Sequence, residues 1–301
     1  MKFPGSIKPH TSLRVPELAD GRRLDDALCL MFPENGRRGV QRLIRTGSVR
    51  VDGRIRPKGY RVVCGQEVSL DLYVPQSRTS EDHLLGQVAV VRVRSNYAAV
   101  YKPGGLHTEG QPFNPHPALE ELLPTLFPGQ DARLLNRLDQ ATSGLVLLGL
   151  SPGAVREYGQ MQDLGKTVKS YLAVVHGRVV QERTVRTALD TCKRPKVRAM
   201  QVQDPDPLRW TEVWPLEYSA PDRVSLVGLK IHKGRRHQIR AHMADVGHPV
   251  VGDHVYGSAH QGPLLLHHCK IRFLGFEAQC SPTWPEWEKR IAGVLVAQGG
   301  L

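Results

Sequence analysis

One carboxylate stands out in a polar loop of the sequence, at Asp139 in the segment NRLDQATSGL. The residues that follow, LVLLGL at 145–150, form a continuous apolar run, which is typical of a strand buried on both faces. Asp139 is therefore expected near the end of a core strand, where a rigid backbone could present a nucleophile or a general acid or base. A loop Asp can also simply cap a turn with its side chain, and the loop alone leaves both interpretations open.

Cations that could pair with this carboxylate lie in the segment 230–245. A helix that begins near His237 would place Arg236 and Arg240 on one face, because residues four apart are neighbours on a helix. A buried carboxylate needs a cation partner to remain ionised, and an arginine stays charged and can bind both oxygens. The histidines of this region are spaced five and six residues apart, which matches no common metal triad, so we expect no metal site.

Tyr171 stands near the start of an expected core strand, 170–175. An aromatic residue in that place ordinarily packs in the core. If it faces the same cavity as Asp139, its ring could stack on a nucleobase and its hydroxyl could transfer a proton. Lys102, which precedes the turn PGG, is a weaker candidate for a phosphate contact.

The elements that would position these residues follow from apolar spacing and turn signals. Apolar residues at helical spacing predict helices, and the acids at 25–26 and the pair Ser151-Pro152 mark helix starts. Short apolar runs between Gly and Pro predict strands. Strands outnumber helices without regular alternation, which predicts an α+β fold. The expected helices are 24–31, 38–45 with Gly47 as its C-cap, 152–163 and 237–246, and the expected strands are 49–51, 61–63, 67–70, 98–101, 145–150, 170–175 and 224–231.

The chain of 301 residues is basic, with 41 Lys and Arg against 29 acids and a net charge of +12. Residues 1–70 hold 3 Lys and 11 Arg against 7 acids, which is +7 of that total. No acid lies between Arg37 and Val51, whereas solvated helix faces usually mix both signs. This stretch indicates a surface that faces phosphates, and the residues assigned to it are Arg37, Arg38, Arg42, Arg45 and Arg50.

Membrane insertion and export have no support in the sequence. No apolar run approaches the roughly 18 residues of a membrane-spanning helix, and the N-terminus lacks the apolar core of a signal peptide. The five cysteines are scattered and form no CxxC pair, which argues against a disulfide framework and a thiolate zinc site. We expect a cytoplasmic protein.

Several ordered motifs resemble those of the RluA-type RNA pseudouridine synthases, over about residues 91–275. They are YKPGGL (101–106), NRLDQATSGL (136–145), KSYLAVVHG (169–177), GRRHQIRAHMADVGHPVVGDHVYG (234–257) and LLLHHCKIRF (264–273). Residues 22–70 are similar to the small α-L RNA-binding module, named after a small-subunit ribosomal protein, that many members carry. The expected organisation is a flexible segment 1–20, the RNA-binding domain 21–71, a linker 72–90, the catalytic domain 91–290 and a tail 291–301.

The resemblance implies that the chain isomerises uridine to pseudouridine in RNA, without a metal or cofactor, on a domain built around a mixed, largely antiparallel sheet. It makes Asp139 the essential carboxylate, Arg240 its ion-pair partner and Tyr171 the residue that stacks on uracil. It leaves open whether the aspartate attacks the sugar or the base, or removes a sugar proton. Arg137 and Arg236, within the same motifs, are expected to contact the RNA.

Three positions depart from the family's pattern: Asn136 replaces a usual His, Ala141 a usual acid and Arg236 a small hydroxyl residue. Asn136 has hydrogen-bonding groups but no charge, so base flipping or target choice could differ. We expect a monomeric synthase for structured RNA, with large-subunit rRNA favoured over tRNA. The alternatives are a non-catalytic RNA-binding or ribosome-assembly factor of the same fold, and a tRNA-directed synthase. A glycosidase ranks last, because the loop offers no second acid near Asp139.

Overall fold

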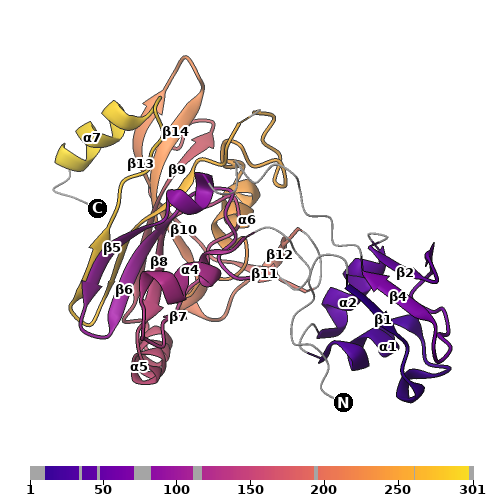
Figure 1. The fold of residues 1–301 in the computed structure, drawn as a ribbon. Coiled ribbons are helices and arrows are strands. Elements are labelled where there is room, and N and C mark those ends of the chain that lie inside the picture. Colours follow the sequence, from indigo (N-terminus) through magenta and orange to yellow (C-terminus); the bar gives the residue numbers. More distant parts are fainter. Residues whose placement is uncertain are drawn as a thin grey trace. The chain divides into compact units, whose positions relative to one another are not determined.

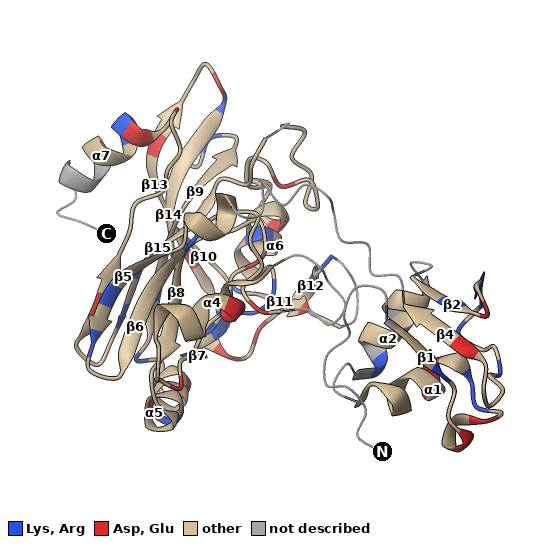
Figure 2. Ribbon diagram, viewed as in Figure 1, with Lys and Arg blue, Asp and Glu red and all other residues tan. Residues whose placement is uncertain are grey.

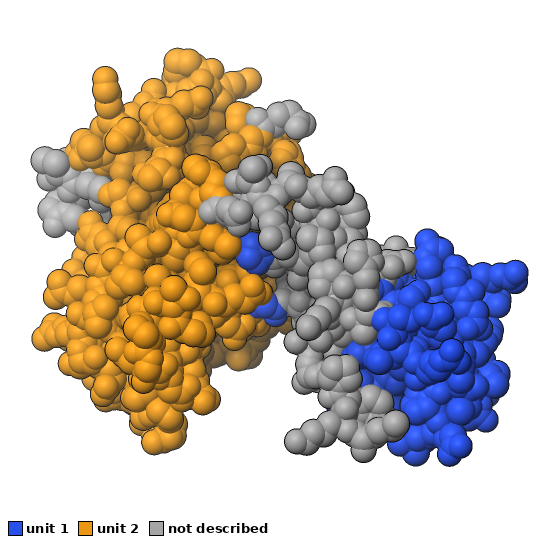
Figure 3. Space-filling view, viewed as in Figure 1, with its two compact units in different colours: residues 1–82, 110–117 blue, residues 83–109, 118–301 orange. Residues whose placement is uncertain are grey.

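The computed structural model describes residues 11–33, 36–45, 48–70, 83–110, 117–192, 196–260 and 262–297. The chain forms two compact units, residues 1–82 with 110–117 and residues 83–109 with 118–301 (Figure 3). None of the helices in the described ranges combines the length and the apolar character needed to cross a membrane.

The smaller unit contains β1 (Thr11–Arg14), η1 (Glu17–Ala19), α1 (Leu24–Met31), α2 (Gly36–Arg45), β2 (Val49–Val51), β3 (Arg54–Ile55) and β4 (Glu67–Leu70). Over its described ranges, the strands form one antiparallel sheet of order β1-β4-β2-β3, against which both helices pack (Figure 1). Leu24, Leu28 and Met31 are all buried, which confirms the helical face expected from their spacing. Asp52 and Gly53 form the β2–β3 turn at positive φ, 49° and 72°, as a tight hairpin requires.

Two expectations for this unit are wrong. Residues 11–20 are not a flexible lead-in, because β1 pairs with β4 and both Val15 and Ala19 are buried. Residues 61–63 form no strand, and Arg61 makes only an isolated bridge. The C-cap expected at Gly47 lies outside the described residues.

The larger unit contains, in chain order, β5 (Ala89–Arg94), β6 (Tyr97–Lys102), α4 (Leu119–Leu126), β7 (Arg133–Leu134), β8 (Ser143–Gly149), α5 (Pro152–Asp163), β9 (Val168–His176), β10 (Arg183–Val185), β11 (Thr187–Asp190), β12 (Arg198–Gln203), η3 (Pro207–Arg209), β13 (Thr211–Ser219), β14 (Val224–Ile231), α6 (Gln238–Asp245), β15 (Leu266–Phe273), β16 (Phe276–Gln279) and α7 (Glu288–Ala297). The four strands and two helices expected here from the sequence are all present.

Within the described residues, the larger unit is built on a ten-stranded mixed sheet of order β10-β13-β14-β9-β15-β8-β6-β5, with β16 beside β15 and β7 beside β8 (Figure 1). Its pairs are antiparallel apart from the parallel pair of β15 and β8. Gly144 permits that pair, because a Cβ there would lie 2.3 Å from the His268 carbonyl oxygen. The α+β class and the largely antiparallel sheet are confirmed.

Both faces of this sheet are covered, which explains its continuous apolar runs. Along β9, Tyr171 and Ala173 pack on the face shared with α4 and α6. Leu172 and Val174 pack on the opposite face, against the residues around α7. Farther along that second face, α5 packs on β6 and β8. Tyr171 therefore lies on the same side of the sheet as α6.

The expected limits of the catalytic domain are also corrected at both ends. Residues 83–90 belong to the larger unit rather than to a linker, and 72–82 lie outside the described residues. Residues 291–297 continue α7 instead of forming a tail, and Ile291 is buried.

Candidate active site

The loop that carries Asp139 is fixed to the strand that follows it. Asn136 accepts a hydrogen bond from the Leu147 N–H of β8 at 2.6 Å and donates to the Leu145 carbonyl at 3.5 Å. The Thr108 hydroxyl fixes Leu138, the residue before Asp139. It accepts the Leu138 N–H at 3.1 Å and donates to the Leu138 carbonyl at 2.8 Å. Asn136 therefore orders the loop backbone, and its amide makes no contact with the Asp139 carboxylate.

The Asp139 carboxylate contacts residues of α6 and of its N-terminus. Arg240 donates Nη1–H to Asp139 Oδ2 at 3.0 Å, and His237 Nε2 lies 3.9 Å from the same oxygen. The turn is closed by the backbone instead, since the Thr142 N–H donates to the Asp139 carbonyl. The interpretation of this side chain as a turn cap is therefore wrong. With 20% of its side chain exposed, Asp139 is held by a cation and still open to a ligand.

Arg240 is itself held by a second carboxylate. Its Nε–H donates to Asp253 Oδ2 at 2.6 Å and its Nη2–H to Asp253 Oδ1 at 2.9 Å. The Asp253 side chain is fully buried and also accepts the backbone N–H groups of Val255 and Tyr256. Burial acts to lower the pKa of Arg240, but the hydrogen bonds and charges of Asp253 and Asp139 outweigh it and raise that pKa. The guanidinium therefore stays charged in this interior position.

Sequence reasoning missed Asp253, to which it assigned no role. The signal that could have identified it is the apolar pair Val250 and Val251 directly before the loop. Both valines are buried, and a carboxylate that follows buried residues needs a cation partner.

Tyr171 comes to this site from β9. Its ring stacks on the imidazole of His268, with centroids 4.5 Å apart and planes 18° apart. His268 is fixed in turn by a hydrogen bond between its Nδ1 and the Leu145 carbonyl at 2.6 Å. Burial raises the pKa of Tyr171 well above its usual range, and the charge of Asp139 adds to this rise. Tyr171 is therefore a buried core residue, 6% exposed, that lies on the side of the sheet facing α6 and close enough to Asp139 to sense its charge.

The assignment of Lys102 to an RNA phosphate is wrong, because this side chain is fully buried. Its ammonium donates to the carbonyls of Pro103, Leu106 and Gln140 at 2.8, 2.7 and 3.2 Å. Burial lowers the pKa of Lys102 to about 7, against the opposing charge of Asp139. Lys102 therefore joins the turn after β6 to the loop of Asp139.

The remaining arginines named from the sequence are spread over the two units, and arginines occur in both α2 and α6 (Figure 2). In the larger unit, Arg137 is exposed and paired with Glu109 at 2.7 Å, and Arg236 is exposed before α6. In the smaller unit, Arg37 is exposed and paired with Asp26, and Arg50 donates to the Gly53 carbonyl at 3.3 Å. The side chains of Arg38, Arg42 and Arg45 lie outside the description.

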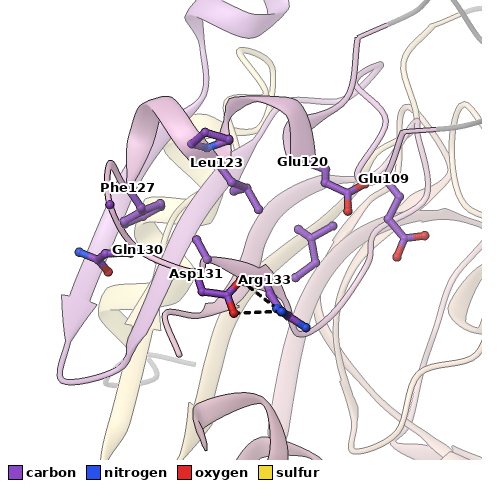
Figure 4. Close-up of a pocket in the computed structure, with 11 residues that line it drawn as sticks. Glu109, Glu120, Leu123, Phe127, Gln130, Asp131 and Arg133 are labelled. Carbon is purple, nitrogen blue, oxygen red and sulfur yellow. Dashed lines mark hydrogen bonds and ion pairs between the residues drawn. The ribbon is translucent and has the colours of Figure 1, made fainter. Parts of the chain in front are cut away.

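A cavity of about 450 Å³ lies apart from this site, between the end of α4 and β7 (Figure 4). Leu123, Phe127 and Leu134 line it together with Glu120 and the Asp131–Arg133 ion pair that Figure 4 shows. None of Asp139, Tyr171 and Arg240 lines this cavity. Across the described ranges, no group of three or more His, Cys, Asp or Glu side chains could hold a metal ion.

Comparison with known proteins assigns the chain to a family. The family model described as RNA pseudouridylate synthase matches residues 96–245. The ribosomal large subunit pseudouridine synthase D of Xylella fastidiosa is 30% identical over 253 residues, which cover 81% of this chain and 74% of that protein. An uncharacterized RNA pseudouridine synthase of Chloroflexus aurantiacus is 30% identical over 288 residues, which cover 91% and 87%.

The chain belongs to the RNA pseudouridylate synthase family. It is therefore an isomerase that converts uridine in RNA to pseudouridine, and the resemblance to RluA-type enzymes is confirmed. The solved structure of human RNA pseudouridylate synthase domain containing 1 is 24% identical, with a TM-score of 0.56 over 67% of this chain and 87% of that one. It supports the pseudouridylate synthase fold of the larger unit.

Proposed function

We propose that this RNA pseudouridylate synthase modifies large-subunit rRNA, and that Asp139 is the carboxylate on which the reaction depends. The observation that carries the assignment is the partly exposed Asp139 carboxylate hydrogen-bonded to the buried, charged Arg240. The target is supported by relatives such as those of Xylella fastidiosa and Escherichia coli, which are named ribosomal large subunit pseudouridine synthases.

The ion pair suits every chemical route by which a carboxylate could begin this reaction. Attack on the sugar, attack on the base and removal of a sugar proton all require an ionised carboxylate at neutral pH. Arg240 places a cation 3.0 Å from Asp139 Oδ2, in the geometry of an ion pair with the carboxylate. Because Asp253 fixes the other side of the same guanidinium, Arg240 orients Asp139 as well as neutralising it.

Tyr171 would supply a flat surface for the target base. His268 supports one face of the phenol ring, so that the ring keeps its orientation when a nucleobase stacks. A target in a helix must leave its stack before it can reach Asp139. Arg137 and Arg236, both exposed on the larger unit, would contact the phosphates on either side of the flipped nucleotide.

The smaller unit is proposed to bind RNA through its phosphates. Its support is the basic stretch Arg37–Arg50, in which no acid occurs, together with the exposure of Arg37. A domain of this kind adds affinity without selecting a sequence, because phosphate contacts carry no base information.

The non-catalytic alternative rested on Asn136. The Asn136 side chain is hydrogen-bonded to the backbone of β8. Its lack of charge therefore does not take a charged group away from the Asp139 carboxylate. These hydrogen bonds favour an active synthase, and we propose that it acts in the cytoplasm as a monomer without a metal or cofactor.

The test is tritium release from unmodified large-subunit rRNA labelled at C5 of uridine, with a pool of unmodified tRNA as the comparison. Release from the rRNA, with pseudouridine at a few defined positions by carbodiimide mapping, is the expected result. Release from tRNA alone would overturn the rRNA target, and silence on both with RNA binding intact would overturn the enzyme assignment.

A further inference from the structure

One step of the isomerisation needs a base, and the inference about that base rests on the proposed function. After uracil has rejoined the ribose through C5, the hydrogen on C5 must leave as a proton. Asp139 Oδ2 already accepts a hydrogen bond from Arg240, and burial raises the pKa of Tyr171, so that little phenolate is present at neutral pH. Lys102 is fully buried and bonded to three carbonyls, so it cannot touch the substrate.

His237 is a further titratable group that borders the Asp139 carboxylate. Its Nε2 lies 3.9 Å from Asp139 Oδ2, a distance too long for a direct hydrogen bond, so that the two atoms border the same space without being bonded to each other. Its side chain is 16% exposed, similar to the 20% of Asp139. The residue also has a left-handed backbone, with φ at 55°, a conformation that is uncommon for side chains other than glycine.

The hydrogen bonds around Tyr256 fix the tautomer of His237. The Tyr256 hydroxyl donates to the Val197 carbonyl at 3.1 Å and accepts the Val197 N–H at 3.0 Å. Because the single phenol proton is used by this carbonyl, the 3.3 Å contact between His237 Nδ1 and the hydroxyl requires the hydrogen on Nδ1. Nε2 of the neutral ring is then an acceptor that faces Asp139.

We propose that His237 is a base of the reaction, whose Nε2 accepts the proton that leaves C5 of the target uracil. In this step the C5–H bond breaks, its electron pair restores the double bond of the uracil ring, and the proton forms an N–H bond at Nε2. N1, released from the ribose, takes its proton from water, and the imidazolium returns one to water, so no proton is gained or lost overall. A uracil that faces the Asp139 carboxylate would also face Nε2, which lies 3.9 Å from Oδ2.

The charged groups around His237 are compatible with this role. Asp139 and Asp253 favour the imidazolium, whereas Arg236 and Arg240 oppose it, and the neutral Tyr256 hydroxyl accepts from Nδ1. Lys196, which lies over the Tyr256 ring, adds a further positive charge beyond it. Burial is the largest effect and lowers the pKa of His237 below its usual value, so the ring is neutral at pH 7. The imidazolium formed by the step would lie beside the Asp139 carboxylate.

The test compares two variants that tolerate the left-handed backbone. His237→Asn keeps a donor near the place of Nδ1 and removes Nε2, and His237→Gly opens a space for added imidazole. Pseudouridine formation is measured in single turnovers on large-subunit rRNA with protium or deuterium at C5. The exposed His83→Asn variant is the matched control.

His237→Asn is expected to slow the reaction by about 100-fold or more, to bind RNA as the wild type does, and to show a larger deuterium effect because proton loss becomes the slowest step. Imidazole should accelerate His237→Gly in proportion to its neutral fraction. A rate within about threefold of the wild type, or a slow variant with neither an isotope effect nor rescue, would overturn the assignment. Asp139→Asn in the same assay separates the two proposals. If the Asp139 variant is inert and the His237 variant is fully active, the role of His237 is contradicted and the role of Asp139 is not.

Discussion

Asp253 binds Arg240 through two hydrogen bonds, of 2.6 and 2.9 Å, in the interior of the larger unit. The bidentate contact uses Nε and Nη2, so that Nη1 is directed to Asp139. The geometry of the candidate site therefore depends on a carboxylate that is buried away from the substrate.

Removing the charge of Asp253 should damage both stability and turnover. Asp253→Asn leaves Arg240 buried with a weaker partner, and loss of one member of a buried pair typically costs about 3 to 5 kcal/mol. We expect a lower free energy of unfolding in urea and a slower single turnover. Asp163→Asn, which removes a carboxylate that is 79% exposed, is the control and should change neither. An Asp253 variant with wild-type stability and rate would contradict the positioning role.

Lys102→Met tests the structural role of the buried ammonium. The substitution keeps the length of the side chain but removes the Lys102 donor from the Pro103 and Leu106 carbonyls, at about 1 to 3 kcal/mol for each unsatisfied group, whereas the Gln140 carbonyl still accepts the Gly105 N–H. We expect a lower unfolding free energy and an unchanged salt dependence of RNA binding. A flatter salt dependence with full stability would instead identify Lys102 as a phosphate contact.

The buried histidines of β15 should make the protein sensitive to acid. Burial lowers the pKa of His267 to about 4 and that of His268 to about 3, so both are neutral in the folded chain. The unfolded chain takes up these protons below about pH 6.5, so stability is lost as the pH falls from there, by on the order of 3 kcal/mol for His267 alone. Urea unfolding between pH 6.5 and 4.5 should therefore have a shallower pH dependence in His267→Gln, whereas the exposed His83→Gln should keep the wild-type slope.

The basic stretch of the smaller unit should contribute to the salt dependence of RNA binding. Replacement of the four arginines of α2 with glutamine is expected to weaken binding and to reduce the slope of log K against log salt by about 0.7 to 0.9 for each phosphate that is no longer neutralised. Titrations from about 50 to about 300 mM salt measure that slope. Unchanged affinity and slope would contradict the proposed role of this unit in RNA binding. The variant replaces Arg37, Arg38, Arg42 and Arg45 with Gln.

Much of the larger unit could be predicted because its strands are buried on both faces. The runs at 145–150 and 170–175 are apolar throughout most of their length, and both became strands of the central sheet. In contrast, β1 has the sequence TSLR, which has no apolar alternation, and it exists through its pairing with β4. Local patterns do not encode such long-range pairing.

The candidate site likewise has parts that could be predicted from the sequence and parts that could not. The pairing of Asp139 with Arg240 could be expected from the need of a carboxylate for a cation, although the two residues are 101 positions apart. The stacking of His268 on Tyr171 could not be expected, because it depends on the register between β9 and β15. The burial of Lys102 could not be predicted either, because its hydrogen-bond partners are backbone carbonyls, which every residue type has.

The dependence of the reaction on Asp139 can be measured by single-turnover tritium release from C5-labelled large-subunit rRNA, with the wild type compared with Asp139→Asn. Asparagine keeps the shape of the side chain without its charge, and Asp131→Asn, which alters an exposed carboxylate near β7, is the control. We expect release by the wild type and the Asp131 variant, and none by the Asp139 variant, which should still bind the RNA. Turnover by Asp139→Asn at a rate close to that of the wild type would contradict the role proposed for this carboxylate.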